Sequence, residues 1–193
     1  MSAATITGPL VTLALPQDRN ARLVVQVLLV LAGTALLAFA SKITVPFWPV
    51  PMTLQTLAVF LIAATYGRNL AVATVIAYLV EGAIGLPVFA TGGGLAYMTG
   101  PTGGYLAGFV VAGAIVGHAA DRGLDRNLFT LFGAMLLGEV AILALGAAWL
   151  AVLMGAEKAL ALGVGPFIIT DVVKIALATA IVRAVGSLLT TRK

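Results

Sequence analysis

The stretch GLPVFATGGGLAYMTGPTGGY, residues 85–105, divides the chain because its composition forbids ordinary helix. Seven glycines, together with Pro87 and Pro101, remove both helix propensity and backbone hydrogen-bonding capacity. The stretch carries no charge and lies between strongly apolar segments, unlike a solvated Gly/Ser linker. We therefore expect a folded cap or re-entrant loop, because irregular backbone beside a bilayer is tolerated where it is buried against protein or lines a cavity. On glycine content alone, a binding-site loop and a purely structural loop are equally well supported.

The composition on either side of this stretch is that of an integral membrane protein. Of 193 residues, 61% are apolar and 9% are charged, against roughly 25% charged in a typical soluble domain. Residues 21–193 are expected to form a single membrane domain. Residues 1–20 lack the basic region and cleavage site of a signal peptide, and we expect a peripheral or disordered segment there.

Several partner and cofactor classes are excluded by composition. The basic residues are scattered singly, so the net charge of +4 does not indicate a nucleic acid, and we expect the lipid bilayer as the partner of the apolar surface. The chain has no cysteine and a single histidine, His118, which excludes disulfides and multi-histidine metal sites. We expect neither a metal nor a cofactor.

Six apolar segments predict an all-α fold, an integral membrane bundle of six transmembrane helices with irregular outer loops. The first segment is an uncharged run close to the roughly 20 residues that cross a bilayer core, whereas the second and third are expected to be short or tilted. Small residues spaced four apart in the fourth segment, Gly104, Gly108 and Ala112, predict close packing on a neighbouring helix. The six predicted helices are residues 23–41, 54–66, 70–86, 104–120, 128–153 and 166–189.

The Lys and Arg residues predict the orientation in the membrane. Six helices put both termini on one side, and eight of the eleven Lys and Arg residues fall on that side, whereas Lys42 and Lys158 fall on the other. The positive-inside rule then makes both termini cytoplasmic, in a multi-pass protein of the cytoplasmic (inner) membrane. The proline-rich loop (residues 42–52) and the glycine-rich loop (residues 85–105) consequently share the outer face.

Three ionisable side chains are expected beneath these loops. Asp171 and Lys174 are three residues apart, hence on one face of the last helix, roughly 8 to 12 Å below its start. Ionisable groups at such a depth cost about 2.5 to 3.5 kcal/mol each on insertion scales and are functional hypotheses by default. Glu81, at a comparable depth, is expected to join them in one polar cluster. The alternative is a self-neutralised pair that only pins helices together, with Glu81 as a partner of Lys174.

Other polar and aromatic side chains each allow two interpretations. Glu139 lies deep in the fifth helix, where a bond across helices is favoured over a proton path because no second carboxylate follows along that helix. Tyr97 and Trp48 can be interfacial anchors or flat walls against a ligand ring, and Gln55 can bind a ligand or only its own helix end. His118 is expected at the membrane interface.

Catalytic motifs are absent from the sequence. It contains no nucleophile elbow, phosphate loop, HExxH or paired-histidine motif, so we expect no enzyme activity. A chain without an ATP site moves a solute down its gradient, by ion coupling, or through a partner ATPase.

Four blocks of sequence resemble the BioY family, the biotin-specific substrate-binding subunits (S components) of energy-coupling-factor (ECF) transporters. The combination of GLPVF with GPTGGY is more specific than a lone glycine motif. The resemblance implies a six-helix membrane subunit that binds biotin from outside, between its outer loops and its last helix. It also implies association with a transmembrane coupling protein and two ATPase subunits, although some members are proposed to act without them. The blocks are VPFWPVPMTLQTLAVFL (45–61), GAIGLPVFATGGG (82–94), GPTGGYLAGF (100–109) and GPFIITDVVK (165–174).

Biotin as the transported ligand suits the candidate residues. The pair Asp171 and Lys174 falls on the ligand-contacting motif that the resemblance implies. Biotin offers two ureido N–H donors, one carbonyl acceptor, a thioether ring and a carboxylate, so its pocket needs acceptors, one cation and apolar walls. The candidate ligand-binding residues are Asp171, Lys174, Glu81, Tyr97 and Gln55.

The glycine-rich loop is expected to act as a lid. Its glycines allow close approach to a small ligand and closure over it, while Pro87 and Pro101 limit the movement. In this division the loop encloses the ligand and the pair on the last helix discriminates. The lid glycines are Gly92, Gly93, Gly94, Gly103 and Gly104.

The first helix carries the candidate coupling surface. Thr34, Ala35 and Ala38 offer a small-residue face that another membrane helix can approach, against the alternative that this face packs internally on the last helix. The alternative function is an ion-coupled or facilitative small-molecule carrier that acts alone and titrates Glu139 or Glu81.

Overall fold

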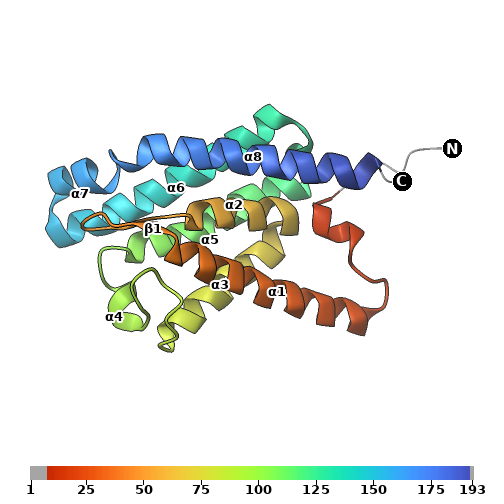
Figure 1. Cartoon of the computed structure of the whole chain (residues 1–193), viewed down its shortest axis with the longest axis horizontal. Coiled ribbons are helices and arrows are strands. Elements are labelled where there is room, and N and C mark those ends of the chain that lie inside the picture. Colours follow the sequence, from red (N-terminus) through yellow and green to blue (C-terminus); the bar gives the residue numbers. More distant parts are fainter. Residues whose placement is uncertain (1–7, 192–193) are drawn as a thin grey trace.

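The computed structural model of the chain describes residues 8–191 and consists of helices joined by short turns and two irregular loops (Figure 1). A short antiparallel ribbon, β1 with β2, pairs Thr44 with Thr53 in the proline-rich loop. We call the end of the bundle that holds β1, α4 and α7 the loop end; α8 finishes at the opposite end (Figure 1). The elements are η1 (Leu10–Leu13), α1 (Arg19–Lys42), β1 (Thr44–Val45), β2 (Met52–Thr53), α2 (Gln55–Tyr66), α3 (Arg68–Ala83), α4 (Leu95–Met98), α5 (Gly103–Asp121), η2 (Leu124–Arg126), α6 (Leu128–Met154), α7 (Ala156–Gly163) and α8 (Phe167–Thr191).

The six predicted helices correspond in order to α1, α2, α3, α5, α6 and α8. The helices α2 and α3 have 12 and 16 residues, or about 18 and 24 Å at 1.5 Å per residue, short of a bilayer core. Within the described residues, α1, α5 and α6 are long and apolar enough to cross a membrane, and α7 with α8, bent by 44° at their junction, makes a fourth candidate span. The helical fold is therefore confirmed, whereas six full-length spans are not seen.

Residues before the predicted start of the first helix extend that helix. Residues 1–7 of the predicted N-terminal segment, and residues 192–193 of the predicted membrane domain, lie outside the described residues. Within the segment, η1 buries Val11. Asp18 caps α1 by accepting a hydrogen bond from the Ala21 backbone N–H at 2.8 Å, so α1 begins at Arg19, before the apolar run that predicts it.

Glycines in α5 let neighbouring helices approach its backbone. A Cβ added at Gly108 would lie 2.7 Å from the Cα of Ile142 in α6, and one at Gly117 would lie 2.6 Å from the Cα of Arg68 in α3. Any side chain at these positions would push the helices apart. The close packing predicted from the spacing in this helix is confirmed.

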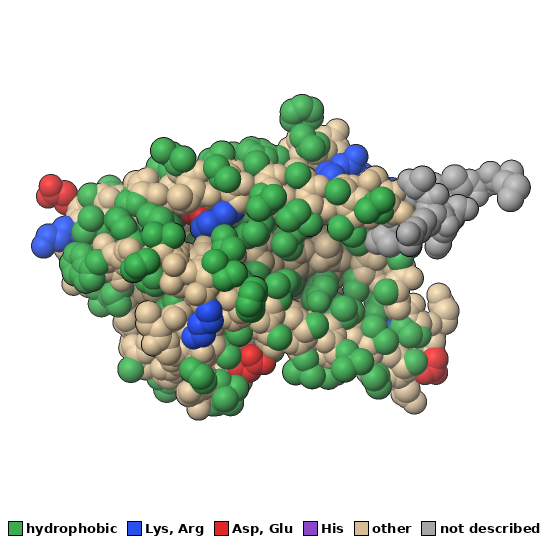
Figure 2. Space-filling model, viewed as in Figure 1, with side chains coloured by type: hydrophobic (Ala, Val, Ile, Leu, Met, Phe, Trp, Pro, Cys, Tyr) green, Lys and Arg blue, Asp and Glu red, His purple; other side chains and the backbone are tan. Residues whose placement is uncertain are grey.

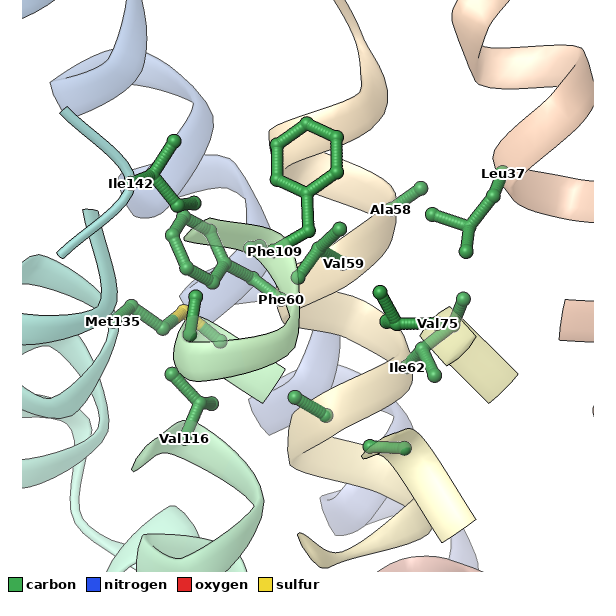
Figure 3. Packing of buried hydrophobic residues seen from close by; sticks show 14 of the residues in the cluster. Leu37, Ala58, Val59, Phe60, Ile62, Val75, Phe109, Val116, Met135 and Ile142 are labelled. Carbon is green, nitrogen blue, oxygen red and sulfur yellow. The ribbon is translucent and has the colours of Figure 1, made fainter. Parts of the chain in front are cut away.

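Large apolar side chains fill the middle of the bundle (Figure 3). Phe60 of α2, Val116 of α5 and Met135 of α6 are each fully buried. Phe60 lies farther from the loop end than Gln55 and Thr56, and Met135 lies farther from it than Glu139, because α2 runs away from that end and α6 runs toward it. This half of the bundle is a packed core.

The outer surface is largely apolar. Figure 2 shows apolar side chains spread over the visible face, with few charged side chains between them. On α1, Leu28 is 59% and Phe39 is 66% exposed. Soluble monomers rarely expose contiguous apolar patches of more than a few hundred Å², so such a surface indicates contact with lipid or with other membrane helices.

Candidate ligand-binding site

A cavity lies near the loop end, between α2, α5, α6 and α8. Its walls are mainly apolar and include Phe109, Ile142 and Phe167. Small-molecule sites usually have this form, a mostly apolar cavity with a few convergent polar groups. The polar side chains in the lining include Thr53, Gln55, Thr56, Tyr97, Thr102, Glu139, Asp171 and Lys174.

Asp171 and Lys174 form an ion pair in this cavity. Lys174 Nζ donates to Asp171 Oδ1 at 2.7 Å, and Asp171 is only 2% exposed. As their spacing predicts, both lie on one face of α8, and that face lines the cavity. An ammonium group has three N–H donors and a carboxylate about four lone-pair sites. The pair therefore neutralises its own charge and still has hydrogen-bonding capacity for a ligand.

Gln55 and Tyr97 also line the cavity, and a neighbour holds each of them. Gln55 Nε2 donates to the Tyr78 hydroxyl at 2.6 Å, so part of its amide is already bonded. The Tyr97 ring stacks on Phe89 with the ring centroids 4.9 Å apart. Both side chains are placed to meet a ligand, and the contact itself stays a prediction.

Glu81 does not join the expected polar cluster. It is half-buried near the end of α3 and is not among the residues that line the cavity. The reason lies in the packing of α3, which contacts α1, α2 and α5, whereas the ion pair is on α8. Lys174 is paired with Asp171, so Glu81 is not its partner either.

Glu139 is the cavity residue that sequence reasoning left out of the site. It is 4% exposed, it lines the cavity, and neither carboxyl oxygen accepts a hydrogen bond from an N–H or hydroxyl group of the described residues. The signal was present, because Glu139 is the only ionisable residue in α6. The sequence favours a structural role for Glu139 because no second carboxylate follows on the same helix. In the structure the second carboxylate, Asp171, comes from α8.

Hydrogen bonds at Val88 and Phe89, near the start of the glycine-rich loop, fasten it to the bundle. The Val88 carbonyl accepts hydrogen bonds from the hydroxyls of Ser41 at 2.8 Å and Tyr78 at 2.9 Å. The next carbonyl, that of Phe89, accepts one from Lys42 Nζ. The Phe89 ring fills a notch that exists because residue 82 is glycine, where any Cβ would meet the ring. Beyond Phe89 the loop is held at two further points, where the Gly94 N–H donates to the Gly82 carbonyl at 2.6 Å and Trp149 Nε1 donates to the Gly100 carbonyl at 2.9 Å.

The five predicted lid glycines have two different roles in the backbone. Gly92 and Gly94 have φ values of 154° and 90°, and Gly94 in particular adopts a conformation that favours glycine. A Cβ at Gly93 would meet the Leu86 carbonyl oxygen. Gly103 and Gly104 instead begin α5, where a Cβ would meet the carbonyl oxygens of Met98 and Leu145, so their placement in a lid is corrected.

A groove separates the two irregular loops. The proline-rich loop contributes Phe47 and Pro49 to one wall, and the glycine-rich loop contributes Ala96 to the other. Three residues, Pro51, Tyr97 and Thr102, line both this groove and the cavity. The groove therefore gives the cavity an entrance at the loop end.

The candidate coupling residues point in different directions. Thr34 is 3% exposed and faces the bundle, whereas Ala35 is exposed and Ala38 is half-buried. The neighbours of α1 are α2 and α3, so its inner face does not pack on the last helix. Trp48 is 70% exposed on the proline-rich loop and does not line the cavity, and His118 is exposed on α5.

Comparison with known proteins gives relatives that match most of the chain. A probable biotin transporter BioY of Pyrococcus horikoshii is 41% identical over 157 residues, which are 81% of this chain and 93% of the relative. The biotin transporter BioY2 of Lactococcus lactis is 34% identical over 166 residues, 82% of this chain and 90% of the relative.

A solved structure has the same fold. The crystal structure of the S-component for biotin from an ECF-type ABC transporter superposes with a TM-score of 0.78 at 26% identity, covering 89% of this chain and 95% of that one. The sequence model of the BioY family matches residues 11–191. This chain therefore belongs to the BioY family.

Proposed function

We propose that this chain binds biotin with high affinity and is the substrate-binding subunit for biotin uptake by an ECF-type ABC transporter. The observation that carries the proposal is the buried ion pair of Asp171 and Lys174 in a mostly apolar cavity of a membrane protein. Relatives that cover about four-fifths of the chain are named as biotin transporters, and a biotin S-component shares the fold. We expect the chain to hydrolyse no ATP itself.

The chemistry of the cavity suits biotin. Lys174 has two N–H donors beyond the one bonded to Asp171, and these can bind the carboxylate of biotin. Carboxylate oxygens can accept the ureido N–H groups, and the walls of Phe109, Ile142 and Phe167 suit the thioether ring and the aliphatic chain.

The loop end is proposed to face outward, with both termini cytoplasmic. The positive-inside rule supports this orientation, since Arg68, Arg122 and Arg126 all lie in or beside turns at the opposite end. The short α2 and α3 also reach that end, because the Arg68 backbone N–H donates to Asp121 Oδ2 at 3.2 Å. Six crossings of a membrane in which α2 and α3 are the short ones follow from this arrangement.

The proposed partners are a transmembrane coupling protein and two ATPase subunits. The exposed apolar surface of α1 supports such a contact, and Ala35 lies on its exposed side. We expect Ala35→Trp to reduce biotin uptake at least tenfold in cells that contain the coupling subunits, because a bulky side chain blocks close helix approach. Biotin binding by the purified variant should equal that of wild type. Uptake at the wild-type rate would remove Ala35 from the coupling surface.

A binding titration tests the function directly. The purified chain in detergent or nanodiscs is titrated with labelled biotin, and we expect stoichiometric binding with a nanomolar dissociation constant and no partner present. No binding at micromolar biotin would contradict the proposal. Uptake assays then separate the energy source: loss on ATP depletion supports the ECF assignment, whereas loss with an uncoupler at constant ATP supports an ion-coupled carrier.

A further inference from the structure

Glu139 is 4% exposed, and no N–H or hydroxyl group of the described residues donates to its carboxyl oxygens; its polar neighbour is the other carboxyl group of the cavity, Asp171. Both Oε1 and Oε2 are buried. Leaving a buried polar group without a partner costs about 1 to 3 kcal/mol, and more for a charged group. Such groups are rare in native interiors, and each needs an explanation. An apolar residue at this position would avoid the cost.

The packing around Glu139 leaves the cavity as the place from which a partner can come. One turn farther from the loop end, Met135 is fully buried, and a Cβ at Gly138 would already lie 3.1 Å from the Phe60 ring. That side of Glu139 is closed by apolar side chains. Its carboxyl group lines the cavity, and a ligand in the cavity can reach it.

The carboxyl groups of the cavity have unused acceptor capacity. Asp171 and Lys174 are paired with each other, and Glu139 interacts with both and shares a side-chain hydrogen bond with Asp171. Thr56 Oγ1 on α2 also lines the cavity and is unbonded. A ligand that satisfies these groups must bring N–H or O–H donors to the two carboxyl groups.

Exposure indicates where each end of such a ligand goes. The side chains of Asp171 and Lys174 are 3% and 13% exposed, and Glu139 is 4% exposed. The two carboxyl groups are therefore the more buried pair, and the cation is the more exposed group. A ligand with N–H donors at one end and an anion at the other fits with its donor end at the carboxyl groups and its strongly hydrated anion at Lys174.

Resting on the proposed function, we infer that Glu139 is a second ligand-contacting carboxyl group, which binds one ureido N–H of biotin while Asp171 binds the other. The two N–H bonds of a five-membered cyclic urea point away from each other, so they require two separate acceptors. Asp171 on α8 and Glu139 on α6 supply one acceptor each from two packed helices. Lys174 is then left for the carboxylate of the ligand.

The test combines variants of Glu139 with altered ligands. The purified chain, its Glu139→Leu and Glu139→Gln variants, and the control Glu157→Gln, whose residue is exposed on α7, are titrated with biotin. They are also titrated with two lactam analogues of biotin, each with one ring N–H replaced by CH₂. We expect Glu139→Leu to raise the biotin dissociation constant at least tenfold, Glu139→Gln to raise it less, and Glu157→Gln to leave it unchanged.

The analogues identify the contact. With the analogue that lacks the N–H bound by Glu139, the variants should bind as wild type does; with the other analogue they should show the full loss. The unfolding midpoint without ligand should stay level or rise in Glu139→Leu, because an unsatisfied polar group is removed. If that variant does not fold, Glu139→Gln with the two analogues gives the decision.

Two outcomes overturn the inference. One is biotin binding at wild-type strength in the Glu139 variants. The other is an equal loss with biotin and both analogues, which indicates a structural role. Both presuppose that the wild-type chain binds biotin; if it binds none, the proposed function itself fails.

Discussion

The cavity and the packed core are two levels of the same bundle, built from the same helices in opposite ways. At the cavity level α2, α6 and α8 contribute the buried polar side chains of Thr56, Glu139 and Asp171. Two of these, Thr56 and Glu139, have hydrogen-bonding atoms without a partner among the described residues. The cavity level thus has polar capacity that the protein itself does not use.

On each of these helices, the side chain four residues farther from the loop end lies on the same face and is apolar. Phe60, Met135 and Ile175 occupy these positions, and each is fully buried; Figure 3 shows Phe60 and Met135 within the packed core. The change from polar to apolar takes one helical turn in all three helices. The bundle therefore has a polar site near one end and a closed apolar layer beneath it. This arrangement favours ligand binding over a continuous polar path across the membrane.

Removing one partner of the ion pair should disturb the cavity level most. We expect Lys174→Ala to raise the biotin dissociation constant at least tenfold and to lower stability by about 3 to 5 kcal/mol, because Asp171 is left buried without its cation. Titration with labelled biotin and thermal unfolding in detergent measure the two effects. Lys158→Ala, at an exposed position on α7, is the matched control. Unchanged affinity in Lys174→Ala would remove the ion pair from the site.

Truncation in the apolar layer should separate the two levels. We expect Met135→Ala to lower the free energy of unfolding by about 2 to 4 kcal/mol, because it leaves a void in a fully buried position. The biotin dissociation constant should change less than threefold, since Met135 does not line the cavity. Leu137→Ala, 61% exposed on the same helix, is the control. A large loss of affinity with little loss of stability would show that the two levels are not independent.

The smallest effect is expected at the opposite end of the bundle, where Asp125 lies in the turn between α5 and α6. Its side chain is 7% exposed with Oδ1 unbonded, and burial raises its pKa, although Arg126 and Arg183 act to lower it. A pKa raised in the folded state favours the protonated carboxyl group. Asp125 therefore contributes to the stability of the fold at low pH, and this contribution is lost as the pH rises through the pKa of the folded state.

Replacing Asp125 by an amide tests this sign. Asp125→Asn cannot ionise, so we expect it to be more stable than wild type at pH 7 by about 0.5 to 1 kcal/mol, with a smaller difference near pH 4. Thermal unfolding at the two pH values measures it. A larger gain at pH 4 than at pH 7 would contradict the assigned direction.

The sequence predicted those features that depend on one helix at a time. Asp171 and Lys174 stand out as charges in an apolar segment, and the glycine spacing of α5 predicts close packing whichever helix is the neighbour. The prediction that places Glu81 in the polar cluster is wrong because the sequence does not show which helices meet. Glu81 and Glu139 are both carboxyl groups within apolar helices, and only the packing of α6, not α3, against α8 brings one of them to the ion pair. Spacing along a chain carries no information on that choice.

The glycine-rich loop shows the same limit. Its composition predicts irregular backbone, and the structure confirms this apart from the single turn of α4 and residues 103–105, which begin α5. Its attachment depends on Ser41 and Lys42, more than forty positions earlier in the chain. Nothing in the local composition reports a hydrogen bond over that separation.

The packing of the Phe89 ring against Gly82 affects the rate and the strength of ligand binding. Ordering one residue of backbone costs about 1 to 2 kcal/mol in conformational entropy. Folding has already fixed the loop at Phe89, and it also holds the Gly94 N–H on the Gly82 carbonyl and the Gly100 carbonyl on Trp149, so little loop backbone is left to order when a ligand binds. Less entropy is then lost at the moment of binding, which favours a long residence time for a ligand as small as biotin.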